Sequence, residues 1–449
     1  KTFGRPFGNP FVLEEVNACQ SWPGDPCSLA RVVSLSRCLL DVCAAPSTSE
    51  ARYAERMRPL QSAWTLLVLV SCSTAAPAEL PPELTTDVGV DDVSFLYPLA
   101  IPLAQRTSLL GAASTGPKGP LLPKDLFAAL PPLDILTPNA ENYSLLRVVS
   151  VRIDPCFPGL GVSGEDACKN QIRMVMQPVL PKPGTGLTTA DLAVHLFYSL
   201  TRSELSGLLQ RMVDLRLGSG IPRSLGPVGI HPALGREGAE GAFAKGFRAL
   251  LLDHAGKDNL TRVTFMGIEQ VGQKWRFGGF DVEGGAMRSI SIPLVTVKEQ
   301  VFQNRDLDGV TFVGAGAEPP SPGPDAIGLL LDPRALAAAS ADERLGAYKA
   351  ALRIENPKLY SPDTIDCATC HSAPAARTFA ERTYGPFPAA LSERYVPPQG
   401  LSSSGATAQA TNELRAFGYF GDRPSVSART VNETAEVVEH VNKVVRKGP

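Results

Sequence analysis

Two hydrophobic patterns divide most of the chain. Between residues 91 and 315, short runs alternate apolar and polar positions, as at Val149, Val151 and Ile153. This alternation places apolar side chains on one face of an extended chain and predicts strands. After residue 326, helix-capping signals and apolar positions at helical spacing predict helices instead. The pattern therefore predicts an α+β protein, with a β-rich domain over 91–315 followed by a small, mainly α domain over 326–449.

The β-rich domain is expected to hold six strands and two or three helices. Thr201 and Glu204 form a capping box for the first helix, and the second runs over Glu237–His254 and ends at Gly256. The turn Glu283–Gly285 predicts a hairpin between the last two strands. The first two strands are expected to be adjacent and antiparallel. The predicted strands are Arg147–Ile153, Ile172–Met176, Asp191–Leu200, Leu260–Ile268, Lys274–Val282 and Met287–Ile292.

The second domain begins after a Pro-rich linker at 316–325. Ser340 and Glu343 predict a capped helix that continues to Ile354. Thr430 and Glu433 predict another capping box, for a helix that continues to about Val445.

The composition is that of a folded protein. Hydrophobic residues make up 44% and charged residues 20% of the chain, which is enough apolar material for a core. The formal net charge of −2 gives no electrostatic reason to expect a nucleic-acid partner. No apolar run reaches the roughly 18 residues that cross a bilayer.

A shorter apolar run, Leu60–Val70, follows Met57 and Arg58. This arrangement predicts a signal peptide over 57–71, although a buried helix of a globular domain is the alternative. Leu69-Val70-Ser71-Cys72 resembles the bacterial lipobox, which implies that Cys72 is lipidated and anchors the protein to a bacterial membrane. Residues 72–90 are Pro-rich and would form the tether. The location implied is the periplasm or cell envelope.

Residues 1–56 are interpreted as not part of the mature protein, because they precede this signal. The alternative is a genuine N-terminal segment whose four cysteines pair with one another. Setting those four and Cys72 aside leaves four of the nine cysteines. Two of them, Cys156 and Cys168, flank a Gly-rich loop and are expected to form a disulfide, with two free buried thiols as the alternative.

The other two lie in the sequence Cys367-Ala-Thr-Cys370-His371, a C-x-x-C-H motif. Cysteines three residues apart face the same side of a helical turn, so both sulfurs can reach one planar group, and the histidine follows directly. A thioredoxin-like redox pair and half of a zinc site are the alternatives.

The motif resembles the haem-attachment site of c-type cytochromes. The resemblance implies one covalent haem c per chain, held by Cys367 and Cys370, with His371 as the proximal iron ligand. It implies that the helices before and after the motif pack around the haem. It also implies that the carbonyl of Pro386, in Gly385-Pro386, orients His371.

The family's usual sixth ligand is a downstream Met, but the last Met in this chain is Met287. His440 is the candidate sixth ligand within the domain, and an open sixth position is an alternative. Three upstream histidines could reach the iron from the β-rich domain: His195, His231 and His254. Candidate partners of the haem propionates are Arg377 and Arg382.

Together these features predict an exported, lipid-anchored, single-haem cytochrome that exchanges electrons with a redox partner in the cell envelope. One alternative is a peroxidase-like or sensor haem protein with an open sixth position. The other is a non-redox surface lipoprotein whose β-rich domain binds a partner. No catalytic signature is found in the β-rich domain.

Overall fold

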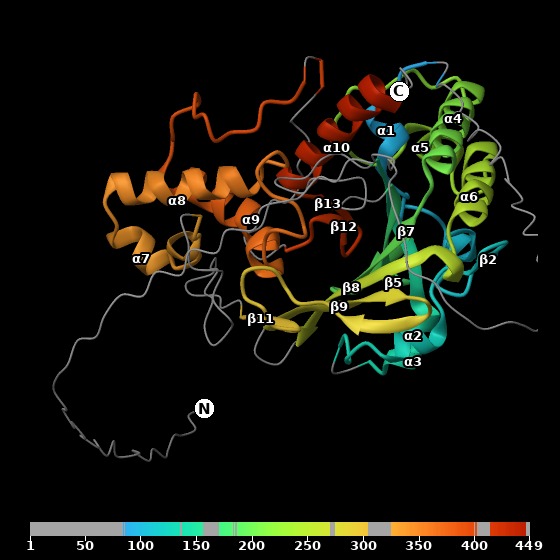
Figure 1. Cartoon of the computed structure of the whole chain (residues 1–449), viewed down its shortest axis with the longest axis horizontal. Coiled ribbons are helices and arrows are strands. Elements are labelled where there is room, and N and C mark those ends of the chain that lie inside the picture. Colours follow the sequence, from blue (N-terminus) through green and yellow to red (C-terminus); the bar gives the residue numbers. More distant parts are fainter. Residues whose placement is uncertain are drawn as a thin grey trace, which may run out of the picture. The chain divides into compact units, whose positions relative to one another are not determined.

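A computed structural model of the chain describes most residues after 84 (Figure 1). The described residues are 84, 86–134, 137–155, 170–182, 184, 186–269, 274–303, 325–398, 400–401 and 414–445. From Thr74 onward the chain forms one compact unit.

An antiparallel sheet is the centre of this unit. Within the described residues it has nine strands, in the order β1-β4-β5-β7-β8-β9-β10, with β11 on β9 and β6 on β5. Two further pairs, β2–β3 and β12–β13, lie outside it. The strands are β1 (Ser94–Leu96), β2 (Thr115–Gly116), β3 (Gly119–Pro120), β4 (Leu146–Asp154), β5 (Gln171–Pro181), β6 (Leu187–Thr189), β7 (Ala193–Ser199), β8 (Leu260–Glu269), β9 (Lys274–Glu283), β10 (Ala286–Ser289), β11 (Glu299–Gln303), β12 (Phe417–Phe420) and β13 (Arg423–Val426).

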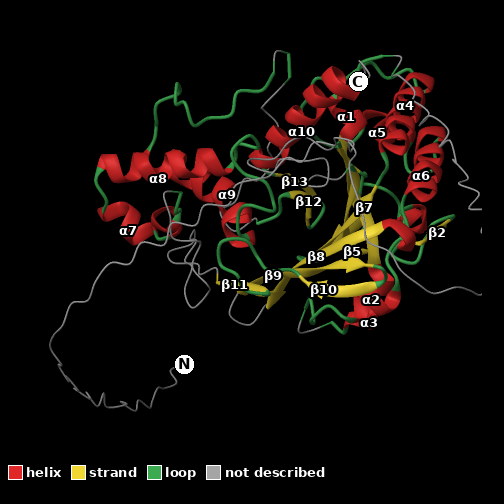
Figure 2. Cartoon of the chain, viewed as in Figure 1, coloured by secondary structure: helices red, strands yellow, loops and turns green. Residues whose placement is uncertain are grey.

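The helices lie around the sheet (Figure 2). They are α1 (Val90–Val93), α2 (Lys124–Ala128), α3 (Asn139–Leu145), α4 (Arg202–Gly218), α5 (Pro232–Glu237), α6 (Ala242–His254), α7 (Pro333–Ala338), α8 (Ala341–Ile354), α9 (Cys367–Tyr384) and α10 (Ala428–His440), with 3-10 turns at Leu103–Ser108, Lys257–Asn259 and Gly328–Leu331 and a π turn at Val441–Val445.

The strand register gives the sheet one apolar face. A row of cross-strand neighbours on five strands is entirely apolar and buried; it consists of Val151, Met174, Leu196, Val263 and Phe280. Phe95 of β1 continues this row and packs on Phe247 of α6, with ring centroids 4.8 Å apart. Helices α4 and α5 pack on α6. This side of the sheet is therefore the hydrophobic core.

The opposite face is polar, because side chains alternate between the two faces of a strand. One row across it is Arg152, Arg173, Phe197, Arg262 and Asp281, and the next is Ser150, Val175, His195, Thr264 and Gly279. We call this surface of two rows the polar face.

The C-terminal part of the chain covers the polar face through specific hydrogen bonds. Ser150 donates to the carbonyl of Phe417, and the amide of Gln177 both donates to and accepts from the backbone of Tyr419. Thr434 of α10 donates to Ser94 of β1. The residues after 414 thus lie against a wall built by the first half of the chain.

Most of the predicted elements are confirmed. The alternating runs form strands β4, β5, β7, β8, β9 and β10, with β4 and β5 antiparallel neighbours. The capping boxes at Thr201 and Ser340 are present, and the hairpin turn has positive φ at Gly284 and Gly285.

Two predicted helix starts are wrong. The helix expected from Glu237 is interrupted at Gly238, whose φ of 75° ends α5, and α6 begins at Ala242. Helix α10 is capped by Ser427, whose side chain accepts from the amide of Thr430. Glu433 is free of any capping role and faces the sheet instead.

The predicted leader at 57–71, the lipidation site Cys72, the disulfide Cys156–Cys168 and residues 1–56 lie outside the described residues, as does the linker 316–325 except for Asp325. In the part of the chain that the structure describes, helices fall short of the length and apolarity that crossing a membrane requires.

Helix α1 carries two buried carboxyl groups. Asp92 accepts two hydrogen bonds from Arg216 of α4, at 2.8 and 3.1 Å. Burial, with the neighbouring charge of Asp92, raises the pKa of Asp91 to about 7 against the hydrogen bond from Ser224. Because the folded state binds this proton more tightly than the unfolded chain, the stabilisation is complete below about pH 4 and is lost as the pH rises toward 7.

We expect the free energy of unfolding of the wild type to fall between pH 5 and pH 8 by on the order of 2 kcal/mol more than that of Asp91→Asn. Urea unfolding at several pH values measures this difference. Asp125→Asn, at an exposed carboxylate of α2, is the control and should follow the wild type. Parallel profiles for Asp91→Asn and the wild type would contradict the prediction.

Candidate functional site

The C-x-x-C-H motif forms the first turn of α9. Asp366 caps the helix and accepts from the amide of Thr369 at 2.9 Å. The buried side chain of Gln300, on β11, donates to Asp366 at 2.7 Å and accepts from the amide of Ala368 at 2.8 Å. The start of α9 is thereby fixed to the edge of the sheet.

Cys367 and Cys370 both carry free thiols, and both line the same cavity. Burial, with the charges of Cys370 and Asp366, raises the pKa of Cys367 to about 12. Burial also raises the pKa of Cys370. The two thiols are therefore protonated at neutral pH.

His371 has a fixed orientation. Its Nδ1 lies 2.6 Å from the carbonyl oxygen of Leu414. Because a carbonyl oxygen only accepts, Nδ1 carries the hydrogen and Nε2 keeps its lone pair, the form that binds a metal ion. Phe277 packs on the ring with centroids 5.0 Å apart. The expectation that Pro386 supplies the orienting carbonyl is wrong, because Leu414 occupies that role.

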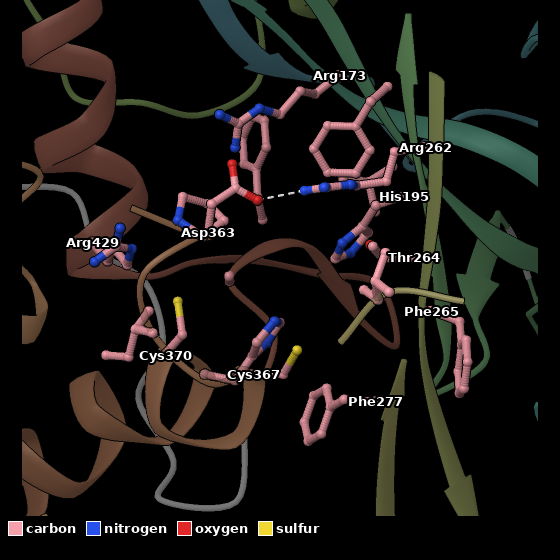
Figure 3. Close-up of a pocket in the computed structure, with 18 of the residues that line it drawn as sticks. Arg173, His195, Arg262, Thr264, Phe265, Phe277, Asp363, Cys367, Cys370 and Arg429 are labelled. Atoms are coloured by element: carbon pink, nitrogen blue, oxygen red, sulfur yellow. Dashed lines mark hydrogen bonds and ion pairs between the residues drawn. The ribbon is translucent and has the colours of Figure 1, made fainter. Parts of the chain in front are cut away.

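His195 faces His371 across the cavity. Its ring centroid lies 6.3 Å from that of His371, and the two ring planes are within 10° of parallel. Figure 3 shows His195 reaching from the sheet toward the side of Cys367 and Cys370. Burial, with the charges of His371 and Arg173, lowers the pKa of His195 to about 3, and burial also lowers the pKa of His371. Both imidazoles are neutral at neutral pH.

The other histidines lie elsewhere. His231 is buried against Phe243 and accepts from the amide of Ala233, while His254 bonds the carbonyl of Leu250 at the end of α6. His440 ends α10, two turns beyond Glu433, and is not among the residues that line the cavity.

The cavity lies between the polar face and helices α9 and α10, with a volume of about 260 Å³. Its walls are mainly apolar. The apolar residues that line it are Met174, Val175, Phe197, Phe265, Phe277, Ile290, Pro293, Pro362, Ile365, Ala416 and Phe417. Four arginines and two acidic residues also line it: Arg152, Arg173, Arg262, Arg429, Asp363 and Glu433.

The arginines are balanced by carboxylates. Arg152 pairs with Asp154 at 2.6 Å and also with Glu433, whereas Arg173 pairs with Asp154. Arg262 pairs with Asp281 and Asp363, both at 2.5 Å. Burial opposes ionisation of Glu433, but Arg152, Arg429 and Arg173 outweigh it and hold the pKa of Glu433 at about 2.

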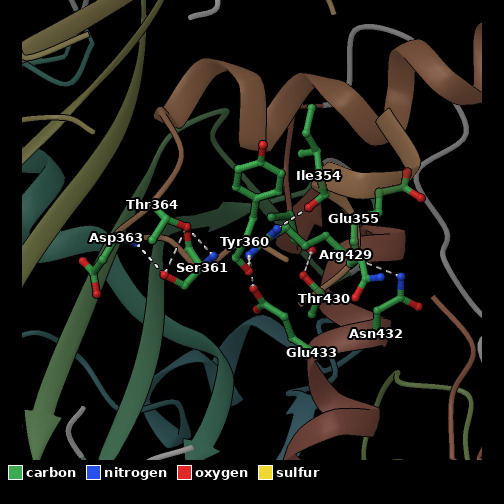
Figure 4. A network of polar contacts seen from close by, with 12 residues as sticks. Ile354, Glu355, Tyr360, Ser361, Asp363, Thr364, Arg429, Thr430, Asn432 and Glu433 are labelled. Carbon is green, nitrogen blue, oxygen red and sulfur yellow. Dashed lines mark hydrogen bonds and ion pairs between the residues drawn. The ribbon is translucent and has the colours of Figure 1, made fainter. Parts of the chain in front are cut away.

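Helix α10 also fixes the loop that leads to the motif (Figure 4). Arg429 donates to the carbonyls of Ile354 and Tyr360 and pairs with Glu433 at 2.9 Å. Asn432 donates to the carbonyl of Glu355 at 2.9 Å. These bonds set the path of the chain between α8 and α9.

The structure thus brings together Cys367, Cys370 and His371 and leaves His440 outside. Arg377 pairs with Glu355 at 2.8 Å, and neither it nor Arg382 lines the cavity. The sheet residues of the site, such as Arg173 and Arg262, were not identified from the sequence. A signal was present for Arg173, which lies between the apolar residues Ile172 and Met174 in a strand.

No family model, curated protein or solved structure matches the chain. Among the described residues, there is no group of three or more His, Cys, Asp and Glu side chains placed to hold a metal ion by themselves. Inferences about function therefore start from the cavity and its residues.

We expect Gln300→Leu to lower the free energy of unfolding by about 1–3 kcal/mol, because it removes one hydrogen bond to Asp366 and leaves the buried amide of Ala368 without Gln300 as its acceptor. Urea unfolding measures the loss. Gln210→Leu removes a bond to Asp214 on the exposed side of α4 and should cost less than about 0.5 kcal/mol. Equal losses for the two variants would show that Gln300 has no special role.

We expect Glu433→Gln to cost about 3–5 kcal/mol, because it leaves Arg152 and Arg429 buried with too little negative charge. Glu439→Gln, on the same helix, removes only an ion pair with the exposed Lys443 and should cost less than about 1 kcal/mol. Thermal unfolding of both variants beside the wild type makes the comparison. A Glu433→Gln protein as stable as Glu439→Gln would contradict this account of the ion network.

Proposed function

We propose that this protein binds one haem c covalently and transfers single electrons in the cell envelope. The observation that carries the proposal is the shared orientation of the motif residues. Both thiols of the C-x-x-C-H motif line one cavity, and the Leu414 carbonyl holds His371 with Nε2 available. A histidine oriented in this way by a carbonyl is the usual arrangement of a metal ligand.

The residue types around the cavity are those that a covalent haem would need. Cys367 and Cys370 would hold it through thioether bonds, and Nε2 of His371 would bind the iron. The apolar walls would suit the flat faces of a porphyrin and would keep water from its iron. When bound, haem supplies one-electron chemistry between Fe(III) and Fe(II), with a redox partner as the donor or acceptor.

The arginines of the polar face suit the two carboxylates of such a group. Arg262 holds Asp363 at the mouth of the cavity, where the Asp363 side chain is 70% exposed. An exposed ion pair of this kind contributes little free energy, so a ligand carboxylate can replace Asp363 on Arg262 at little cost. Arg173, at 21% exposure, is the second candidate.

The cavity does not favour the two other uses of a C-x-x-C pair. Thiol–disulfide exchange needs a thiolate, and cysteines that perform it have a lowered pKa, whereas the pKa of Cys367 is raised to about 12. A structural zinc site needs four ligands. Within the described residues no group of His, Cys, Asp and Glu side chains supplies them.

The proposal extends to location. Haem attachment of this type follows export in the c-type cytochromes that the motif resembles, so the proposed signal peptide at 57–71 and lipid anchor at Cys72 belong to the same hypothesis. In this proposal residues 326–449 carry the attachment site, α8 packs along α9, and the sheet supplies the opposite wall.

To test the proposal, the full chain is produced behind a secretion signal in a bacterium that matures c-type cytochromes. We expect one haem per chain that stays with the polypeptide on a denaturing gel and gives a c-type pyridine haemochrome. The double variant Cys367→Ser/Cys370→Ser should lose all covalent haem. Thr378→Ala, on α9 but outside the cavity, should retain it.

A wild-type chain without covalent haem, under conditions in which a control cytochrome matures, overturns the proposal. Zinc bound in one-to-one ratio and released by thiol alkylation would also overturn it and favour the zinc alternative.

A further inference from the structure

The second axial position of the proposed haem has a candidate ligand in the sheet. His195 is in the middle of β7, on the polar face, between the neighbours Val175 and Thr264 on the adjoining strands. Its side chain is half-buried and lines the cavity, and in the described part of the chain its ring makes no hydrogen bond. An imidazole without a partner on the wall of a mainly apolar cavity has a lone pair that a ligand can use.

The distance between the two histidine rings matches that of two imidazoles bound to one metal ion. Metal–nitrogen bonds to imidazole are about 2 Å long, so two rings bound on opposite sides of one metal ion have centroids about 6 Å apart. The observed separation of the ring centroids is 6.3 Å, and the planes are nearly parallel. Rings in direct stacking contact would have centroids closer than this. A single water molecule between the rings would account for their spacing but not for the two thiols that line the same cavity.

Other ligands are less well placed. Met174 also lines the cavity, but it belongs to the buried apolar row of Val151 and Leu196, so its side chain enters the core on the other side of the sheet. His440 lies two turns along α10 from the lining residue Glu433. One turn of helix rises about 5.4 Å, which places His440 beyond the end of the cavity.

We propose that His195 is the second axial ligand of the haem iron, opposite His371. The inference rests on the proposed haem function and makes it more specific. If protein held both axial positions, peroxide and other small molecules would have no site on the iron, which would favour electron transfer over the peroxidase-like and sensor alternatives. The haem would also join α9 to the centre of the sheet.

The experiment uses the full-length holoprotein. Ferric electron paramagnetic resonance and the absorption spectra of both oxidation states report the spin state, and carbon monoxide binding to the ferrous form reports an open position. We expect a low-spin wild type that binds carbon monoxide poorly. His195→Ala should keep its covalent haem, become high-spin and bind carbon monoxide readily. Added imidazole should restore the low-spin spectrum, which a purely structural loss would not allow.

His440→Ala and Met174→Leu are the comparison variants, and both should keep the wild-type spectra. A low-spin His195→Ala, or loss of the low-spin signal in His440→Ala or Met174→Leu alone, overturns the assignment to His195. A high-spin wild type with covalent haem also overturns it while leaving the proposed function standing. Absence of covalent haem in the pyridine haemochrome assay overturns both.

Discussion

The ion pair between Arg152 and Glu433 is the contact on which the rest of the site depends. It joins β4 to α10 inside the protein, and Asp154 and Arg429 extend it on either side. Charges removed from water in this way are tolerated only when every one has a partner. These ion pairs therefore hold helix α10 in a single position on the sheet. That position closes the cavity and, through Arg429, fixes the loop that leads to the motif.

The same constraint explains why the sheet has two different faces. Its apolar row is covered by helices whose contacts need only shape and hydrophobicity. The polar face carries Ser150, Arg173 and Gln177, whose groups must be satisfied individually once covered. The backbone of Phe417 and Tyr419 supplies partners for Ser150 and Gln177, and Asp154 supplies one for Arg173. The cavity remains beside these contacts, next to His195. The site thus lies where the polar face combines paired arginines with His195, whose ring makes no hydrogen bond within the described residues.

Whether a feature of the fold or the site could be predicted depends on how far apart in the sequence the residues that determine it lie. Alternation, capping boxes and the motif are local, so the strands, α4, α8 and the grouping of Cys367 with Cys370 could be predicted from the sequence. Partnerships across the fold could not. Glu433 has the spacing of a capping residue, yet the distant Arg152 binds it, and Leu414, unremarkable in sequence, supplies the carbonyl for His371. Strand register, which aligns Arg173 with Phe197 and Arg262, is likewise set by tertiary structure.

The two halves of the proposed haem site therefore differ in what creates them. Cys367, Cys370 and His371 share one helical turn, so that half forms wherever α9 begins to fold. His195 lies in a central strand and reaches the same cavity only when β7 is paired and α10 is docked. In this proposal the two thioether bonds would need only this helical turn, whereas the orientation of His371 by Leu414 and the bond from His195 would need the complete fold. If the motif alone held the haem, one axial position of the iron would stay open. In this proposal His195, on the sheet, would fill that position.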